Sequence, residues 1–228
     1  MMTSQRLRSW GLGTAGLLLA ACDDGPEVRF VQPFPAQAAD MAVFPARHRG
    51  VYTAADVGKS LCIGRTAVWR QELQRVMSTR RQADSALRYH LRADTTYEQE
   101  GRLHYVHLVG RDSVRDSWLW TDTIFTLAGT EAGKLRRFQG RYYLNSPTDL
   151  KDKWKVERLE IDGLGLNWQT LGTDTLRLQV LAPGTVRYHR EKGALTSIWL
   201  TPASREQARQ VGRYAGLWET QETYQRRH

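Results

Sequence analysis

Two groups of aromatic and basic side chains are the residues of this sequence best suited to binding a ligand. Trp118 and Trp120 stand two apart in a strand-like segment, so both side chains point to one face. On an exposed face they form a platform for sugars or a groove for an apolar ligand, and on a covered face they belong to the core. The second group suits a phosphate or an acidic glycan. Its candidate ligand-binding residues, in the stretch KLRRFQGRYY, are Arg136, Arg137, Arg141 and Tyr143.

The histidines and acids do not form a recognisable catalytic or metal-binding set. His104 and His107 are three apart in a strand-like segment, which sends them to opposite faces and keeps them from sharing a metal ion. No two acids stand out as the facing carboxylates of a glycosidase. Nucleophile-elbow, phosphate-loop, dinucleotide-binding and zinc-helix motifs do not occur in the sequence. We therefore predict no catalytic residues, no metal site and no cofactor.

The N-terminus carries a targeting signal. Arg6 and Arg8 precede an apolar run, residues 10–21, that has the length of the hydrophobic region of a secretory signal. Asp23 ends this run well short of the about 20 apolar residues that a membrane-spanning helix needs. The sequence therefore predicts a signal peptide and no permanent transmembrane helix.

The end of this run, Leu19–Cys22 (LAAC), resembles the lipobox of bacterial lipoproteins. The resemblance implies cleavage before Cys22, a diacylglycerol thioether on its sulfur, and acylation, such as palmitoylation, of the new amino group. Two or more acyl chains anchor a protein stably at a membrane surface. The expected location is the bacterial cell envelope, on the periplasmic face of the outer membrane, on the cell surface, or on the inner membrane. The acids after Cys22 resemble sorting signals of more than one kind.

Charge and cysteine count narrow the expected partners. Removing residues 1–21 lowers the formal net charge from +9 to about +7, because Arg6 and Arg8 leave with them. A basic surface in the envelope suits an anionic glycan, a lipid headgroup or another envelope protein, and that location argues against nucleic acid. Once Cys22 is lipidated, Cys62 has no partner for an intrachain disulfide. We expect a buried structural thiol there.

The chain divides into three expected parts. Residues 1–21 are the signal peptide, residues 22–46 a tether that contains four of the seven prolines, and residues 47–228 a single mainly-β domain. Phe30, Phe34 and Phe44 indicate that part of the tether packs on the domain.

Short alternating segments separated by turn residues predict an antiparallel β-meander that forms a sandwich or a barrel-like body. Residues 67–76 also fit a helix, and we assign them to a strand from their context. Ser204 and Gln207 have the spacing of a capping box, which predicts one short C-terminal helix that Gly212 can end. The predicted strands are 50–53, 60–64, 67–76, 85–92, 103–109, 117–127, 140–144, 155–161, 166–171, 175–181, 185–190 and 196–200.

A faint internal similarity leaves open whether the domain has two similar halves. Residues 48–52 (HRGVY) resemble residues 138–142 (FQGRY), and each segment precedes two apolar strands. The function we predict is that of a lipid-anchored envelope protein that acts as a binding or structural module. A lipocalin-like carrier of a small apolar ligand or lipid is the alternative, followed by an envelope hydrolase.

Overall fold

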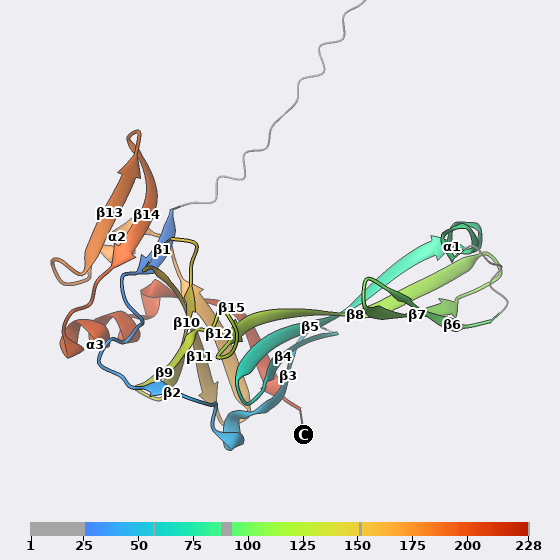
Figure 1. Cartoon of the computed structure of the whole chain (residues 1–228), viewed down its shortest axis with the longest axis horizontal. Coiled ribbons are helices and arrows are strands. Elements are labelled where there is room, and N and C mark those ends of the chain that lie inside the picture. Colours follow the sequence, from blue (N-terminus) through green and yellow to red (C-terminus); the bar gives the residue numbers. More distant parts are fainter. Residues whose placement is uncertain (1–25, 57, 88–92, 151, 228) are drawn as a thin grey trace, which may run out of the picture.

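The structure, a computed structural model, describes residues 26–56, 58–87, 93–150 and 152–227, so the signal segment and Cys22 lie outside it. The chain is mainly antiparallel β-structure, as the sequence predicts, and its described strands form one large sheet (Figure 1). The elements, in chain order, are β1 (Glu27–Phe30), β2 (Asp40–Met41), η1 (Ala46–His48), β3 (Gly50–Ala54), β4 (Lys59–Ile63), β5 (Ala67–Thr79), α1 (Arg80–Leu87), β6 (Thr95–Gln99), β7 (Arg102–Leu108), β8 (Ser113–Thr126), β9 (Lys134–Phe138), β10 (Arg141–Pro147), β11 (Trp154–Asp162), β12 (Gly165–Leu171), α2 (Thr175–Leu178), β13 (Val186–Glu191), β14 (Ala194–Leu200), α3 (Arg205–Arg213), η2 (Ala215–Leu217) and β15 (Trp218–Arg226).

The sheet is open and mostly follows hairpin connections. Its strand order is β13-β14-β1-β11-β12-β15-β3-β4-β5-β8-β7-β6, and β10, β9 and β2 continue from β11. Described neighbours pair antiparallel except β1 and β14, which run parallel with Val28 opposite Ile198. Gln139 and Gly140 both have positive φ, as the two-residue hairpin turn between β9 and β10 requires.

Two hydrophobic cores lie on opposite faces of β11, because successive side chains of a strand point to opposite sides. The first core lies between the sheet and α3, and the second lies where strands from distant parts of the sheet fold toward each other. The first core contains Val28, Phe30, Phe34, Tyr143, Val156, Leu178, Leu181, Ile198, Leu200, Ala208, Val211, Leu217 and Trp218. The second contains Phe44, Tyr52, Leu61, Ile63, Val68, Phe125, Leu135, Tyr142, Leu144, Leu159, Leu166 and Tyr224.

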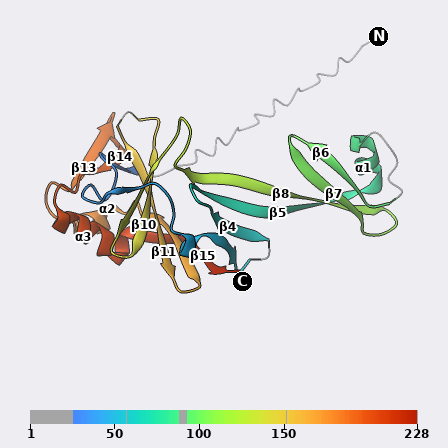
Figure 2. The ribbon, with the colours of Figure 1, turned by 60° about the horizontal axis from the view of Figure 1, so that its bottom comes forward.

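A long projection leaves the body, and we call it the arm (the described residues of 73–119). β5 and β8 pair from Ala67 opposite Thr126 to Thr79 opposite Ser113, whereas the pairing of β5 with β4 reaches only to Glu72. The outer halves of β5 and β8 therefore extend beyond the body together with β6, β7 and α1 (Figures 1 and 2). We call the face of the arm that carries α1 its inner face, and the opposite one its outer face. Val106 and Val114 form a small core under α1.

The strand assignment of residues 67–76 is confirmed, and so is the capping box of the C-terminal helix. The Gln207 amide donates to Ser204 Oγ at 3.1 Å, and the Ser204 amide donates to Gln207 Oε1 at 3.2 Å. Gly212 lies inside this helix instead of ending it, and Tyr214 is the C-cap.

Two predicted strands are wrong where the structure describes them. Residues 175–181 begin with α2, since Asp174 Oδ1 accepts the Leu176 amide at 2.9 Å and caps a helical turn. Of the predicted strand 85–92, residues 85–87 belong to α1, and the others lie outside the described residues. In both places, a local cap outweighs the alternation of apolar residues.

The folded body begins earlier than predicted. Phe30, Phe34 and Phe44 are buried, as expected for a segment that packs on the domain. In addition, β1 and β2 lie within the segment assigned to the tether and join the sheet. The described part of residues 22–46 therefore belongs to the folded body, through backbone pairing and aromatic burial, and does not form a separate tether.

Cys62 is buried and free, as predicted, and its thiol donates to Gln71 Oε1 at 3.3 Å. Burial raises the pKa of this thiol. Among the helices of the described residues, none combines the length and the apolar character that crossing a bilayer demands.

Candidate functional site

The structure does not bring the predicted ligand-binding residues together. Trp118 and Trp120 lie on β8, on and next to the arm, while the arginines and Tyr143 lie on β9 and β10 in the body. The basic-aromatic group is mostly engaged inside the protein. Arg136 Nε pairs with Asp40 Oδ1 at 2.6 Å, and its Nη1 donates to the carbonyls of Pro33 and Pro35. Arg136 thus fastens the N-terminal segment.

The rest of this group also serves the packing of the β9–β10 hairpin. Tyr143 is fully buried against the rings of Phe34 and Trp218, and burial raises the pKa of its hydroxyl. Arg141 pairs with Glu160 at 2.8 Å. Arg137 is exposed, with its guanidinium 5.4 Å from the centre of the buried Tyr142 ring. Arg137 is the one predicted arginine whose side chain faces solvent.

Trp118 and Trp120 do share one face, because they pair with Gln74 and Glu72 of β5 in register. Both side chains are half-buried on the inner face. The guanidinium of Arg70 lies over the Trp120 ring at 5.2 Å from its centre. Trp120 therefore belongs to the junction of arm and body.

Trp118 continues into a stack of rings across three strands of the arm. The rings of Tyr97 on β6, His104 on β7 and Trp118 on β8 are stacked, with centroid distances of 4.6 and 4.8 Å. Asp116 holds this stack, since it accepts from the Tyr97 hydroxyl at 2.7 Å and contacts His104 Nδ1 at 3.0 Å. Stacked side chains of neighbouring strands cover each other's faces. This stack therefore presents mainly ring edges to a ligand, and less of a flat platform than the sequence suggested.

Beside the stack, the inner face has a hollow of about 540 Å³ that we call the arm depression. Its floor is mainly apolar and its wall comes from α1, while Asp116 supplies a carboxylate at the side. The lining residues that matter most for contact are Val76, Ala86, Leu87, Tyr97, Val106 and Val114. This site was not predicted from the sequence, because the end of α1 was expected to form a strand. The spacing of Thr79 and Gln82, which form a capping box, was the available signal.

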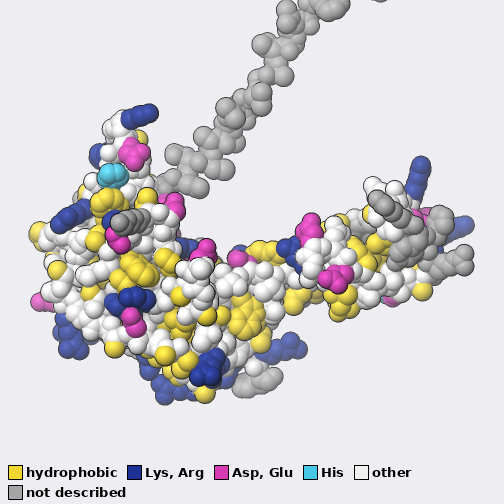
Figure 3. Space-filling model, in the orientation of Figure 1, with side chains coloured by type: hydrophobic (Ala, Val, Ile, Leu, Met, Phe, Trp, Pro, Cys, Tyr) yellow, Lys and Arg dark blue, Asp and Glu magenta, His cyan; other side chains and the backbone are white. Residues whose placement is uncertain are grey.

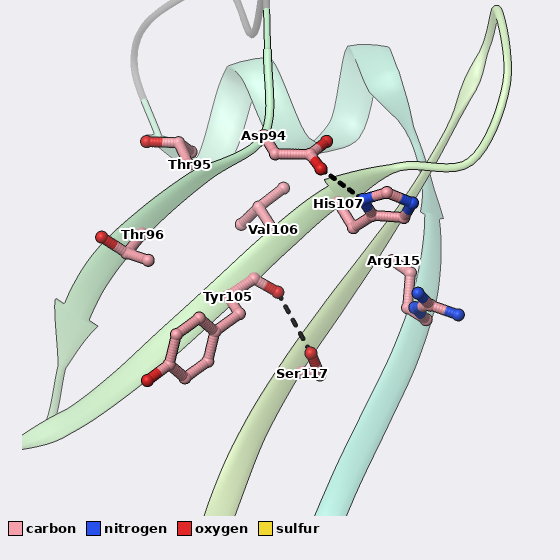
Figure 4. Close-up of a pocket in the computed structure, with 8 residues that line it drawn as sticks. All are labelled: Asp94, Thr95, Thr96, Tyr105, Val106, His107, Arg115 and Ser117. Atoms are coloured by element: carbon pink, nitrogen blue, oxygen red, sulfur yellow. Dashed lines mark hydrogen bonds and ion pairs between the residues drawn. The ribbon is translucent and has the colours of Figure 1, made fainter.

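The outer face has a shallower hollow around His107 (Figure 4). His107 Nδ1 pairs with the exposed carboxylate of Asp94, which also accepts the Leu108 amide at 2.8 Å. These two hydrogen bonds lower the pKa of Asp94. The Ser117 hydroxyl donates to the Tyr105 carbonyl at 3.2 Å and not to the imidazole, so the described arrangement does not activate a nucleophile.

The histidine prediction is confirmed. His104 is buried on the inner face, whereas His107 is exposed on the outer face, as expected for positions three apart in β7. Over the part of the chain that the structure describes, no three histidine, cysteine or acidic side chains gather as metal ligands would. In comparisons with protein-family models, curated proteins and solved structures, nothing matches this chain.

Proposed function

We propose that this protein is a lipid-anchored component of the bacterial cell envelope that acts as an interaction module, with the arm as its binding part. The observation that carries this proposal is the arm depression, an apolar hollow on an element that neither large core requires. The lipobox Leu19–Cys22 supports the anchor. The body would then hold the arm at a distance from the membrane surface.

The composition of the arm supports a binding role. Its own core is small, with Val106 and Val114 as the buried members, yet several large apolar side chains on the arm remain exposed (Figure 3). On the outer face, the exposed large apolar side chains are Met77, Leu103, Tyr105 and Leu119. Exposed apolar side chains gathered on one face mark interaction sites in soluble domains.

The chemistry of the arm depression favours a protein partner over a glycan or a lipid headgroup. Its floor can take one or a few apolar side chains, and Asp116 is placed to meet a basic or hydroxyl group beside them. A phosphate or an acidic glycan would instead face the carboxylate of Asp116. We therefore propose a segment of another envelope protein that combines apolar and basic side chains.

The second core argues against a lipocalin-like carrier as the main function. Side chains from β3, β4, β5, β8, β10, β11, β12 and β15 occupy the space that a lipocalin-like ligand would need. Three of them, Tyr52, Tyr142 and Tyr224, are fully buried aromatic residues. This filling supports an interaction module, whose binding surface lies outside its core.

Filling the arm depression tests the binding role. Ala86→Arg places a long side chain in the hollow, while Ser85→Arg puts the same charge on the neighbouring exposed position of α1 that does not line it. The anchored full chain is captured from envelopes after crosslinking, and bound proteins are compared by mass spectrometry. A protein recovered with the native chain and with Ser85→Arg, but lost with Ala86→Arg, supports the proposal. Equal recovery with all three chains overturns it.

A separate experiment tests the anchor. Cys22→Ala removes the acceptor sulfur, so the chain is expected to keep its signal segment, lose radioactive fatty-acid label and leave the lipoprotein fraction. Cys62→Ala is the matched control, because this thiol is buried and outside the lipobox. Unchanged mass, unchanged labelling and unchanged fractionation of the Cys22→Ala chain would refute lipidation.

A further inference from the structure

Among the described residues, the outer half of β5 has no strand partner on the side away from β8 and is an open sheet edge. Its partner β4 begins at Lys59, opposite Glu72, and the last backbone hydrogen bond that the described residues make on that side is the Leu73 amide donating to the Gly58 carbonyl at 2.8 Å. On the other side, β5 stays paired with β8 to Thr79. Backbone groups alternate in direction along an antiparallel strand. The N–H and C=O groups of Arg75 and Met77 therefore point to the open edge, as those of Leu73 do.

The open edge is bounded at both ends by residues that accept its backbone hydrogen bonds. Gly58 occupies the edge at Leu73, and at the far end the Thr79 amide donates to Gln82 Oε1 of α1. The open length is thus residues 74–78. Within it, β5 shows no register shift against β8, and its sequence QRVMS contains no proline. Proteins commonly protect sheet edges by bulges, prolines or several charges. This one has one charged residue, Arg75.

Two of the exposed side chains on this edge are apolar. Val76 is 49% exposed on the inner face, and Met77 is 56% exposed on the outer face. On the outer face, Leu73 and Leu119 form a further apolar pair, separated from Met77 by Arg75. A strand that pairs with β5 would cover part of this surface and satisfy the open backbone groups.

We propose that the occupant is a second copy of this chain, and that two arms pair through β5 in an antiparallel, two-fold arrangement centred on Val76. In this register, Arg75 of each copy exchanges two backbone hydrogen bonds with Met77 of the other, using the groups that point outward. Val76 faces its own counterpart as the closely spaced, non-hydrogen-bonded pair. The pairing continues the four arm strands of one copy into those of the other.

The side chains are compatible with self-pairing in this register. Arg75 lies opposite Met77 on the outer face, so the two arginines do not meet and each can extend its aliphatic stem over a methionine. On the inner face, Gln74 lies opposite Ser78, and the two Val76 side chains make an aliphatic contact. Cross-strand pairs of this type stabilise a sheet, whereas like charges directly opposite destabilise it. A two-fold axis also gives a closed dimer and not an open chain of molecules.

Disulfide trapping tests the register. The full chain carries Cys22→Ser and is purified in mild detergent, so the result does not depend on lipidation or on the proposed partner, and buried Cys62 stays out of reach. Val76→Cys is expected to form an intermolecular disulfide on mild oxidation about tenfold faster than Val180→Cys, an equally exposed site on the body. Ser78→Cys is the register control, because it would face Gln74 and not its own counterpart.

Two variants at Met77 test the edge itself. Met77→Pro removes an N–H that points outward, so the hydrogen bonds between β5 and β8 stay intact. Because both copies lose this N–H, the dimer keeps two of the four backbone hydrogen bonds between Arg75 and Met77. Met77→Lys leaves the backbone intact and places Lys opposite Arg75 twice, which is expected to weaken association about tenfold. Sedimentation measures the association, and hydrogen exchange checks that the strands of the arm remain folded.

Each outcome of these experiments either supports or overturns the dimer. Fast trapping of Val76→Cys with slow trapping of Ser78→Cys, together with weaker association of Met77→Lys, supports the dimer. A chain that stays monomeric, equal trapping at residues 76, 78 and 180, or unchanged association of Met77→Lys overturns it. A monomeric chain whose β5 edge is instead occupied by a strand of another envelope protein also overturns it, and leaves the proposed interaction function standing.

Discussion

Tyr97 and Asp116 are joined by a hydrogen bond of 2.7 Å that reaches from the outermost strand of the arm, β6, across β7 to β8. The same carboxylate contacts the imidazole of His104 between them. One acidic side chain thus binds β6 and β7 to β8, one of the two strands that connect the arm to the body.

Removal of this carboxylate is expected to loosen the arm without unfolding the body. Asp116→Ala leaves the Tyr97 hydroxyl and His104 Nδ1 without their shared acceptor, which costs about 1–3 kcal/mol of local stability. Hydrogen exchange should accelerate in β6 and β7 and stay unchanged in β10 and β11. The control, Asp122→Ala, removes a half-exposed carboxylate of β8 that makes only a 3.4 Å contact with Arg70. Equal acceleration by both variants would contradict the role assigned to Asp116.

Glu157 is expected to make the body more stable when it is protonated. Its carboxyl is buried, and burial raises its pKa above the ordinary 4.5, although the charge of Lys155, 3.0 Å away, partly opposes this. The folded state therefore binds this proton more tightly than the unfolded state, and the stability that it contributes is lost as pH rises from about 4.5 through the folded pKa.

The variant Glu157→Gln removes this proton linkage. Its free energy of unfolding, relative to that of the native chain, should rise with pH above about 4.5, by about 1.4 kcal/mol for each unit by which the folded pKa is raised. Urea unfolding at a series of pH values measures the difference. Glu160→Gln, at a half-exposed position of the same strand, is the control. A difference between Glu157→Gln and the native chain that does not change with pH would show that the prediction is wrong.

Gly133 is expected to tolerate no side chain. A Cβ there would lie 2.4 Å from the Phe125 ring and 2.5 Å from the Asn145 carbonyl oxygen, so buried backbone or an aromatic ring has to move. Gly133→Ala should lower the free energy of unfolding by about 1–3 kcal/mol. At Gly110 a Cβ would meet nothing within 4 Å, so Gly110→Ala should leave the unfolding midpoint nearly unchanged. Thermal unfolding of the two variants is compared. A lower midpoint for Gly133→Ala alone supports crowding at this position, whereas equal changes in both variants would indicate a general effect of replacing glycine.

Asn145 is expected to hold the N-terminal segment on the body. Its fully buried amide donates to the carbonyls of Phe34, Lys134 and Tyr143, and its oxygen accepts the Phe34 amide. Asn145→Ala leaves these groups unsatisfied, which costs about 2–4 kcal/mol.

The rate of limited proteolysis measures how firmly the N-terminal segment is attached to the body. Cleavage of the native chain is expected to be slow between Phe30 and Phe44, and that of the Asn145→Ala chain fast. Asn167→Ala removes an amide that contacts Thr223 at the other side of the body and should leave cleavage there unchanged. Slow cleavage of the Asn145→Ala chain would assign the attachment to Arg136 and the aromatic residues instead.

The strands of the fold could be predicted because their side chains alternate and turn residues separate them. Even the ambiguous residues 67–76 are a strand, since they pair with β8 throughout and with β4 as far as Glu72. The stretch 175–181 alternates just as well, yet forms α2, where Leu178 is buried and Leu176 is 71% exposed. Alternation alone cannot reveal that Asp174 caps a helical turn.

The candidate site was harder to predict than the fold. The shared face of Trp118 and Trp120 follows from strand geometry and is confirmed. Their ring partners come from β6 and β7, and which strands become neighbours depends on pairing across the whole sheet. The arm depression also needs α1, which follows β5 without a break in sequence. The basic-aromatic stretch looked exposed because its charges are dense, whereas the structure pairs Arg136 with Asp40, far away in sequence.

The order of strands in the sheet also determines when each part of the chain can fold. The arm is a set of hairpins within residues 67–126, whose partners become available one after another. The body is different, since β1 pairs with β14 and β3 with β15, the last strand of the chain. Contacts between distant segments form late and slowly. The arm is therefore the part that can assemble first, while the body can form its local hairpins but cannot be completed until β15 is available.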